Sequence, residues 1–242
     1  MTGDTNEIAL DIQDLRKHFG AIRAVDGCSF KVPRGKISGL IGPNGSGKTT
    51  TFNLLTGVIP PDSGDVFYKG RNLTGLKPYQ IFRLGISRTF QIVRIYRVMT
   101  VFENLLSVSS LSIPEREARA RAEELMEFVT LSKLRGEYGG NLSYGQQKLL
   151  EFARALMTEP DVILLDEPAA GVNRTLLQTL LDHIHWLQEQ GKTIVIVEHD
   201  MNVIMNHCEK IFVMDYGVKI AEGPPVEIQK NEQVLEAYFG RR

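Results

Sequence analysis

Apolar and polar residues alternate with a period of two in two segments near the start of the chain. In a strand, successive side chains point to opposite faces of the sheet, so this period predicts two half-buried strands. The apolar positions are Ile8, Leu10 and Ile12 in the first segment, and Ile22, Ala24, Cys28, Phe30 and Val32 in the second. A further short strand is predicted over 65–68, after the turn-forming stretch PPDSG at 60–64.

Short apolar runs and helical stretches alternate along much of the remaining chain. The runs KISGLIG (36–42), DVILLDE (161–167) and KTIVIVEHD (192–200) are predicted to be buried strands. Helices are predicted over 48–57 and over 175–191, and the second of these connects two of the buried strands. A hairpin over 211–223 and a helix over 231–240 follow. Strands that alternate with helices indicate a mainly parallel α/β sheet.

Between these strands, apolar residues recur at helical spacing instead. The apolar positions of the stretch 115–129 are Ala118, Ala122, Leu125, Met126 and Val129. A second helix is predicted from about Gln146 to Met157. We therefore predict a core formed by residues 1–91 and 155–242, with a helical part, residues 92–154, inserted between its two halves.

The composition is that of an ordinary globular protein. Hydrophobic residues make up 43% and charged residues 24%, and the formal net charge of -1 gives no indication of nucleic-acid binding. The two cysteines stand in apolar-patterned surroundings, which favours buried thiols over a disulfide. We find no signal-peptide pattern and no stretch near the ~20 apolar residues that span a bilayer. If the protein acts at a membrane, we therefore expect it to do so through a partner protein.

Charge is nevertheless uneven along the chain. Residues 66–102 include seven basic residues and no acidic one. Such a tract can be a solvated face, or it can be a surface that binds a partner. The basic residues are Lys69, Arg71, Lys77, Arg83, Arg88, Arg94 and Arg97.

The stretch GPNGSGKT at 42–49 carries the clearest chemistry. It follows a predicted strand and opens a predicted helix, which is the setting of a phosphate-binding loop. Its glycines let backbone N–H groups surround phosphates, Lys48 can reach the β- and γ-phosphates, and the Thr49 hydroxyl can ligate Mg²⁺. The predicted nucleotide-binding residues here are Gly42, Pro43, Asn44, Gly45, Ser46, Gly47, Lys48, Thr49 and Thr50.

A carboxylate pair ends the apolar run at 162–165. A buried strand that delivers Asp166 at its tip is suited to hold Mg²⁺, and Glu167, one residue further on, could polarise an attacking water. Alone this signal is weak, but together with the loop it predicts nucleotide hydrolysis. Kinases, GTPases and transporters share the loop, so other motifs have to indicate which process the hydrolysis drives.

The stretch NLSYGQQKLLEFARAL (141–156) supplies such a motif, because it resembles the LSGGQ signature of ATP-binding-cassette (ABC) ATPases. The resemblance implies that Ser143, Gly145 and Gln146 bind the ATP held by a second cassette, packed head to tail. Tyr144 departs from the usual glycine of the signature, and we expect this position to tolerate the change.

Other positions match this family one by one. Phe19 resembles the aromatic residue that stacks on adenine, although a core-facing phenylalanine at a strand end is the alternative. Gln91, in RTFQ, resembles the glutamine that reaches Mg²⁺ and the lytic water, and His199 resembles the histidine that contacts the γ-phosphate. In AAGVN, Asn173 replaces a common aspartate, which leaves the contribution of this loop to the partner cassette open.

The remaining histidines have no spacing typical of a metal site. His183 and His185 stand two apart on a predicted helix and so face different sides. For His207 we expect no partner of ligand type nearby.

Finer features most resemble the ATP-binding subunits of branched-chain amino-acid importers. They are GISRTFQIVRIYRVMTVFENLL (85–106), NLSYGQQ, LLDEPAAGVN, VEHDM and VLEAYFG. The resemblance implies a P-loop NTPase (RecA-like) core with an N-terminal antiparallel β subdomain and an inserted α-helical subdomain. It also implies ATP and Mg²⁺ as ligands and a peripheral position on the cytoplasmic side of the inner membrane.

The implied partners are integral membrane permease subunits and a second cassette, identical or not, with a substrate-binding protein reached indirectly and no nucleic acid. Arg88, Arg94 and Arg97 are expected surface contributors to the permease contact or to the adjacent cytosolic membrane face. Import of urea or short amides, and export of lipid or lipopolysaccharide, are the transport alternatives. A non-transport ABC ATPase acting on ribosomes or DNA is a further alternative, and a kinase or GTPase is the remotest.

Overall fold

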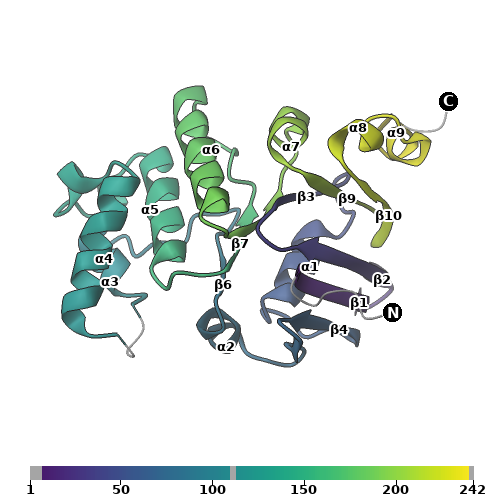
Figure 1. Cartoon of the computed structure of the whole chain (residues 1–242), viewed down its shortest axis with the longest axis horizontal. Helices are drawn as coiled ribbons and strands as arrows, with labels where there is room; N and C mark the ends of the chain where they lie inside the picture. The colour runs from purple at the N-terminus through teal and green to yellow at the C-terminus, as the bar shows by residue number, and fades with distance from the viewer. Residues whose placement is uncertain (1–6, 110–112, 240–242) are drawn as a thin grey trace.

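The computed structural model describes residues 7–109 and 113–239 (Figure 1). Its strands are β1 (Ile8–Phe19), β2 (Ile22–Pro33), β3 (Ile37–Ile41), β4 (Ser63–Tyr68), β5 (Arg71–Asn72), β6 (Ile86–Arg88), β7 (Val162–Asp166), β8 (Thr193–Val197), β9 (Lys210–Asp215) and β10 (Val218–Gly223). Its α-helices are α1 (Lys48–Leu55), α2 (Pro78–Arg83), α3 (Val101–Leu106), α4 (Glu115–Phe128), α5 (Tyr144–Leu156), α6 (Arg174–Glu189), α7 (Met201–His207), α8 (Pro225–Ile228) and α9 (Glu232–Phe239). Two short 3₁₀ helices cover Ser132–Leu134 and Gly139–Asn141.

A six-stranded sheet with the order β10-β9-β3-β8-β7-β6 runs through the centre of the molecule. Its pairings are parallel except at β10, which joins the edge as a hairpin with β9. Side chains of β7 alternate between two hydrophobic clusters: Ile163 and Leu165 pack with α5, α6 and α7, whereas Val162 and Leu164 pack on the opposite face. Both faces are covered, which explains why these strands read as continuous apolar runs.

The opposite face is covered by α1 and by an antiparallel sheet with the order β2-β1-β4-β5 (Figure 1). The predicted alternation in β2 is wrong in its first half, because Ile22 is exposed and Val25 is buried instead. The pairing with β1 shifts register on either side of Leu15, opposite Cys28, and Gly27 there has a φ of 75°. Such a bulge reverses which face the following residues occupy.

Three helices, α3, α4 and α5, pack together at one end of the molecule (Figure 1). Helix α5 starts at Tyr144, two residues before the predicted start, because Ser143 is its N-cap and forms a capping box with Gln146. It ends at Leu156, so the division predicted at residue 154 falls inside this helix.

The carboxyl ends of β3, β7 and β8 lie side by side, because these strands are parallel neighbours. In an open α/β sheet this edge is where ligands bind. The stretch 42–47 follows β3, Glu167 follows β7, and His199 lies just beyond β8. Sequence motifs more than 100 residues apart therefore meet at one edge. Within 7–109 and 113–239, the structure contains no helix with the length and apolar character needed to cross a membrane.

Candidate nucleotide site

The loop over 42–47 is shaped by its backbone. Gly42 and Gly47 have φ values of 154° and 101°, which L side chains rarely adopt. A Cβ on Gly42 would lie 2.1 Å from the Met214 carbonyl oxygen, and one on Gly47 would lie 2.2 Å from that of Ala24. Only glycine fits at these two places, and the loop leads directly into the N-terminus of α1.

Lys48 lies across this loop. Its Nζ donates hydrogen bonds to the carbonyl oxygens of Gly42, at 2.7 Å, and Pro43, at 2.9 Å. Burial lowers the pKa of Lys48, while the charges of Glu167 and Asp166 act to raise it. The charges of both carboxylates therefore act on the ammonium group. Of the other loop residues, Asn44, Gly45 and Thr49 are exposed, Pro43, Gly47 and Thr50 are half-buried, and Gly42 and Ser46 are buried.

Asp166 ends β7 with its carboxylate buried. Its Oδ2 accepts a hydrogen bond from Arg88 Nη2 at 2.8 Å, whereas its buried Oδ1 has no hydrogen-bond partner among the described residues. Burial raises the pKa of Asp166, and the Arg88 contact acts to lower it. A buried carboxylate oxygen without a partner, close to a phosphate loop, suits a hard cation such as Mg²⁺. The donor set of Asp166, Thr49 and Gln91 therefore fits this ion.

Glu167 joins two residues that are far away in the sequence. Its Oε1 lies 2.7 Å from His199 Nε2, and its Oε2 accepts a hydrogen bond from Gln91 Nε2 at 2.9 Å. Its backbone has a φ of 49°, an uncommon value for a residue other than glycine, and its N–H bonds to the Val197 carbonyl oxygen. Such local strain clusters at functional sites. The arrangement fixes a carboxylate that can accept a proton from water.

Phe19 lies at the tip of the β1–β2 hairpin. The ring is 49% exposed, so the alternative of a core-facing phenylalanine is wrong. The Nζ of Lys17 lies 5.8 Å from the ring centroid. An exposed ring of this kind can stack on a nucleobase.

The structure places the signature residues away from the loop of the same chain. Helix α5 lies with α3 and α4, whereas α1 lies against β1 and β2 (Figure 1). Ser143 and Gln146 bond to each other, with Gln146 N donating to Ser143 Oγ at 3.3 Å and Ser143 N donating to Gln146 Oε1 at 2.9 Å. In the described part of the chain, no hydrogen bond or ion pair connects 143–146 with 42–50.

Two buried side chains that the sequence analysis missed lie at the strand ends, and one of them comes from the signature helix. Lys148, on α5, is buried and its Nζ donates to the Glu167 carbonyl oxygen at 2.7 Å. Glu198 is buried beside His199 and accepts a hydrogen bond from the Ala169 backbone. Burial raises the pKa of Glu198, and the backbone donors of Ala169, His199 and Asp200 act to lower it. In the sequence, the visible signal for the Lys148–Glu167 contact was a lysine inside the apolar run of α5.

The two departures from the family pattern lie at structured positions. A Cβ on Gly171 would lie 2.7 Å from the Tyr144 ring, so Tyr144 packs against the loop that follows Glu167. Asn173 is the N-cap of α6, and its Oδ1 accepts a hydrogen bond from Leu176 N at 2.9 Å. Asparagine and aspartate are both strong N-caps, which accounts for the replacement.

Two expectations from the sequence are wrong. Arg88 is not a surface residue: its side chain is 6% exposed and paired with Asp166. The expectation for His207 also fails, because its Nδ1 lies 2.8 Å from His185 Nε2. The sequence could not show this pair, since it forms only where α6 and α7 pack together. Arg94 and Arg97 are exposed, as expected.

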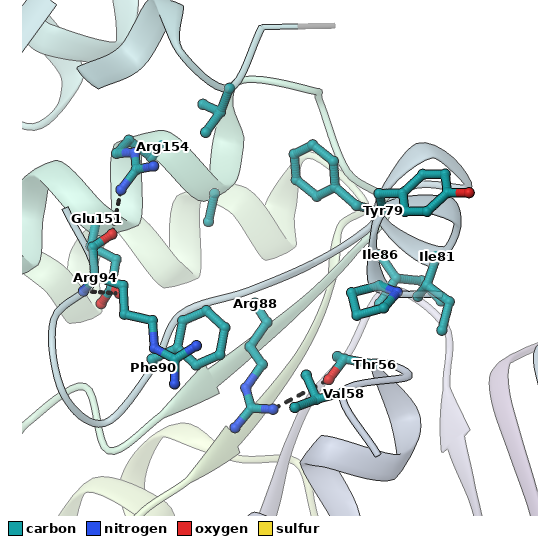
Figure 2. A pocket seen from close by; sticks show the side chains of 14 residues that line it. Thr56, Val58, Tyr79, Ile81, Ile86, Arg88, Phe90, Arg94, Glu151 and Arg154 are labelled. Carbon is teal, nitrogen blue, oxygen red and sulfur yellow. Dashed lines mark hydrogen bonds between the residues drawn. The ribbon is translucent and has the colours of Figure 1, made fainter. Parts of the chain in front are cut away.

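A groove lies beside the nucleotide site, between α2, β6 and α5 (Figure 2). Its cavity measures roughly 310 Å³ and is lined by apolar side chains such as Val58 and Tyr79, together with a few charged ones. Glu151, on α5, accepts a hydrogen bond from Arg94 N at 2.8 Å, which fixes the segment after Gln91 to this helix. Burial raises the pKa of Glu151.

Comparisons with known proteins show which family the chain belongs to. The family model "ABC transporter" matches residues 25–170, and "Branched-chain amino acid ATP-binding cassette transporter" matches 218–242. The chain is 40% identical to the probable branched-chain amino acid transport ATP-binding protein LivG of Archaeoglobus fulgidus, covering 96% of this chain and 95% of that protein. It is 39% identical to the high-affinity LivG of Salmonella typhimurium, with 96% and 97% covered.

Solved structures give the same result. The ADP conformation of MJ1267, an ATP-binding cassette of an ABC transporter, superposes with a TM-score of 0.86 at 35% identity, over 97% of this chain and 99% of that one. The dimeric post-hydrolysis state of the cassette MJ0796, bound to ADP and Pi, gives 0.80 at 26% identity, over 89% and 98%. The predicted fold class is confirmed, and the chain belongs to the ABC transporter family as an ATP-binding cassette.

Proposed function

We propose that this chain is the ATP-hydrolysing subunit of an importer for branched-chain amino acids. The observation that carries the proposal is the joining of Gln91, Glu167 and His199 at the sheet edge that also carries the phosphate loop. For the substrate class, support comes from the family match at 218–242 and from relatives named for branched-chain amino acid transport.

In this proposal the residues at the strand ends divide the work of binding and hydrolysis. The loop N–H groups and Lys48 bind the phosphates of ATP, and Phe19 stacks on the adenine. Glu167 accepts a proton from the attacking water. Gln91 and His199 hold the two carboxylate oxygens of Glu167 in place. Lys48 also stabilises the charge that develops on the γ-phosphate.

Mg²⁺ is the metal that these residues suit best. Thr49, Asp166 and Gln91 would hold it, and the buried, unpartnered Oδ1 of Asp166 supports this assignment. When bound, the ion would neutralise charge on the β- and γ-phosphate oxygens.

A second cassette is the partner that completes the site. Ser143, Gly145 and Gln146 lie apart from their own loop, at the N-terminus of α5, where a helix favours a phosphate. Head-to-tail packing of two cassettes would place these residues on the ATP of the partner. Dimeric cassettes exist among the solved structures that resemble this chain.

Permease subunits are the other proposed partners, and the groove in Figure 2 is their docking place. Arg94 lines the groove and is exposed, and Arg97 is exposed three residues further along the chain. Both can contact either the permease or an anionic membrane surface. The chain would then lie at the cytoplasmic side of the membrane and reach the substrate-binding protein indirectly. We further propose residues 92–154 as the inserted helical part and the remainder as the nucleotide-binding core, with α5 running on across this division to Leu156.

Uptake in cells tests the proposal. Cells whose only copy carries Glu167→Gln are given labelled leucine, urea and a control sugar. Loss of leucine uptake alone is the expected result. Loss of urea uptake alone would retain the motor and change the cargo. If uptake of all three were unchanged, import would be refuted and export would become the leading function.

A further inference from the structure

Arg88 contacts three parts of the nucleotide site at once. Its Nη2 donates to Asp166 Oδ2 at 2.8 Å, and its Nη1 donates to Asn53 Oδ1 at 2.7 Å and to Thr56 Oγ1 at 3.2 Å. Asn53 lies on α1 and Thr56 caps its end, so the guanidinium connects the helix of the phosphate loop to the tip of β7. Its carbon Cζ also lies 4.8 Å from the centroid of the Phe90 ring.

The same side chain forms part of the groove. Figure 2 shows Arg88 between Phe90 and the Thr56 and Val58 side chains, with its hydrogen bond to Thr56 dashed. All four residues line the cavity. An occupant of the groove would therefore touch the side chains that fix Arg88, and Arg88 is in turn bonded to Asp166.

The Asp166 carboxylate depends on this contact for its orientation. One of its oxygens bonds to Arg88, and the other is buried without a partner among the residues that the structure describes. A buried carboxylate whose charge is paired on one side presents its free oxygen in a fixed direction. Lysine at position 88 would supply charge but not the planar fork that bonds to Asp166 and α1 together.

We propose that Arg88 is a positioning residue that holds Asp166 for the divalent metal and relays occupancy of the groove to that carboxylate. The proposal rests on the proposed function, because it assumes a metal–ATP site at Asp166. It goes beyond that function because it assigns to Arg88 the connection between the docking groove and the metal ligand Asp166.

The first experiment separates nucleotide affinity from metal affinity in the purified chain. Binding of a fluorescent ATP analogue is measured in EDTA, and Mn²⁺ binding to the protein–ATP complex is measured by electron paramagnetic resonance. For Arg88→Lys we expect unchanged nucleotide affinity in EDTA and a fall of about 10- to 100-fold in Mn²⁺ affinity, as for lost partners of metal ligands. Arg71→Lys, at an exposed arginine on β5, is the matched control and should retain both affinities.

This design also guards against misfolding. Unchanged nucleotide affinity in EDTA shows that the phosphate loop of the variant is intact, so a loss of Mn²⁺ affinity then reports on Asp166. If wild-type protein bound no metal–ATP complex, the proposed function would fall. If wild-type protein bound it and Arg88→Lys kept the same Mn²⁺ affinity, Arg88 would not position Asp166, while the proposed function would stand.

The second experiment tests the relay through the groove. Cys28 and Cys208 are buried, so an environment-sensitive maleimide dye should label Val58→Cys selectively at the groove. We expect the dye emission to change when Mg²⁺ is added to the ATP complex, because linkage between two sites is reciprocal. With Arg88→Lys added, this change should disappear. An emission that never responds to Mg²⁺, or that responds equally in both proteins, would refute the relay.

Discussion

The phosphate loop and the Glu167 centre share one edge of the sheet but are built in different ways. The loop is one short stretch, 42–49, whose shape depends on glycines and on backbone atoms that leave no room for a Cβ. The Glu167 centre is built from side chains of three segments, with partners 76 and 32 residues away in the sequence. The loop is therefore local and sterically fixed, whereas the centre exists only when the sheet has assembled.

This difference predicts different responses to substitution. A change in the loop should affect folding and nucleotide binding together. A change in the centre should affect the chemical step and leave binding intact, because Glu167 and its partners act on the water. The predictions below test that separation.

Gly47→Ala should have the largest effect. The new Cβ would be strained at a φ of 101° and would lie 2.2 Å from the Ala24 carbonyl oxygen. We expect a loss of about 2–5 kcal/mol in the free energy of unfolding, together with loss of ATP binding. Urea unfolding and nucleotide titration measure the two effects. Gly191→Ala, with a φ of 81° and open space around it, carries the strain without the clash and should retain binding.

Glu167→Gln should come next, with folding intact. Glutamine keeps the size of the side chain but cannot accept the proton of the water, so hydrolysis should fall by about 10²- to 10⁴-fold. ATP should still bind, and an ATP-bound dimer should accumulate on a sizing column. Glu189→Gln, at the exposed end of α6, is the control. Full turnover in Glu167→Gln would show that another group accepts the proton.

Lys148→Met tests a contact at the base of the centre. The variant removes the charged donor from the buried Glu167 and Pro168 carbonyl oxygens. We expect a loss of about 1–3 kcal/mol in unfolding free energy, because these acceptors would remain unpaired. The rate of hydrolysis should fall with little change in ATP affinity. Lys133→Met, at an exposed position, should change neither quantity. Equal behaviour of the two variants would show that the hydrogen bonds of Lys148 contribute neither to stability nor to hydrolysis.

The sequence was sufficient for the features that are local. The fold class followed from alternating strands and helices, and the loop, Asp166 and Glu167 followed from short motifs next to predicted strands. The family resemblance added Gln91 and His199, and the structure places both on Glu167. Their catalytic roles stay predictions.

What the sequence did not show depends on neighbours in space. Arg88 stood in a basic tract, and nothing in the tract indicated that its guanidinium is buried against Asp166. The burial of Val25 in place of Ala24 depends on the bulge at Gly27, where one glycine reverses the faces of a strand. Pattern analysis assumes a regular period, so it fails where the backbone departs from it.

The His185–His207 pair gives the smallest predicted effect, and it lies away from both compared regions. Burial, and then the charge of His185, lower the pKa of His207, whereas Asp182 acts to raise it. Burial also lowers the pKa of His183. In the unfolded chain these histidines take up protons near a pKa of about 6.5, so on acidification below that value the unfolded state binds more protons than the folded one. Stability should therefore fall slightly as the pH drops through this window.

Thermal unfolding at about pH 7.5 and about pH 5.5 measures the effect. His207→Gln should reduce the dependence on pH, because it removes one proton-binding group and the repulsion within the pair. Since the pair is half-buried, water screens its charge and the melting temperature should move by no more than a few degrees. ATP binding should not follow it, because the pair makes no contact with either the loop or Glu167 among the described residues.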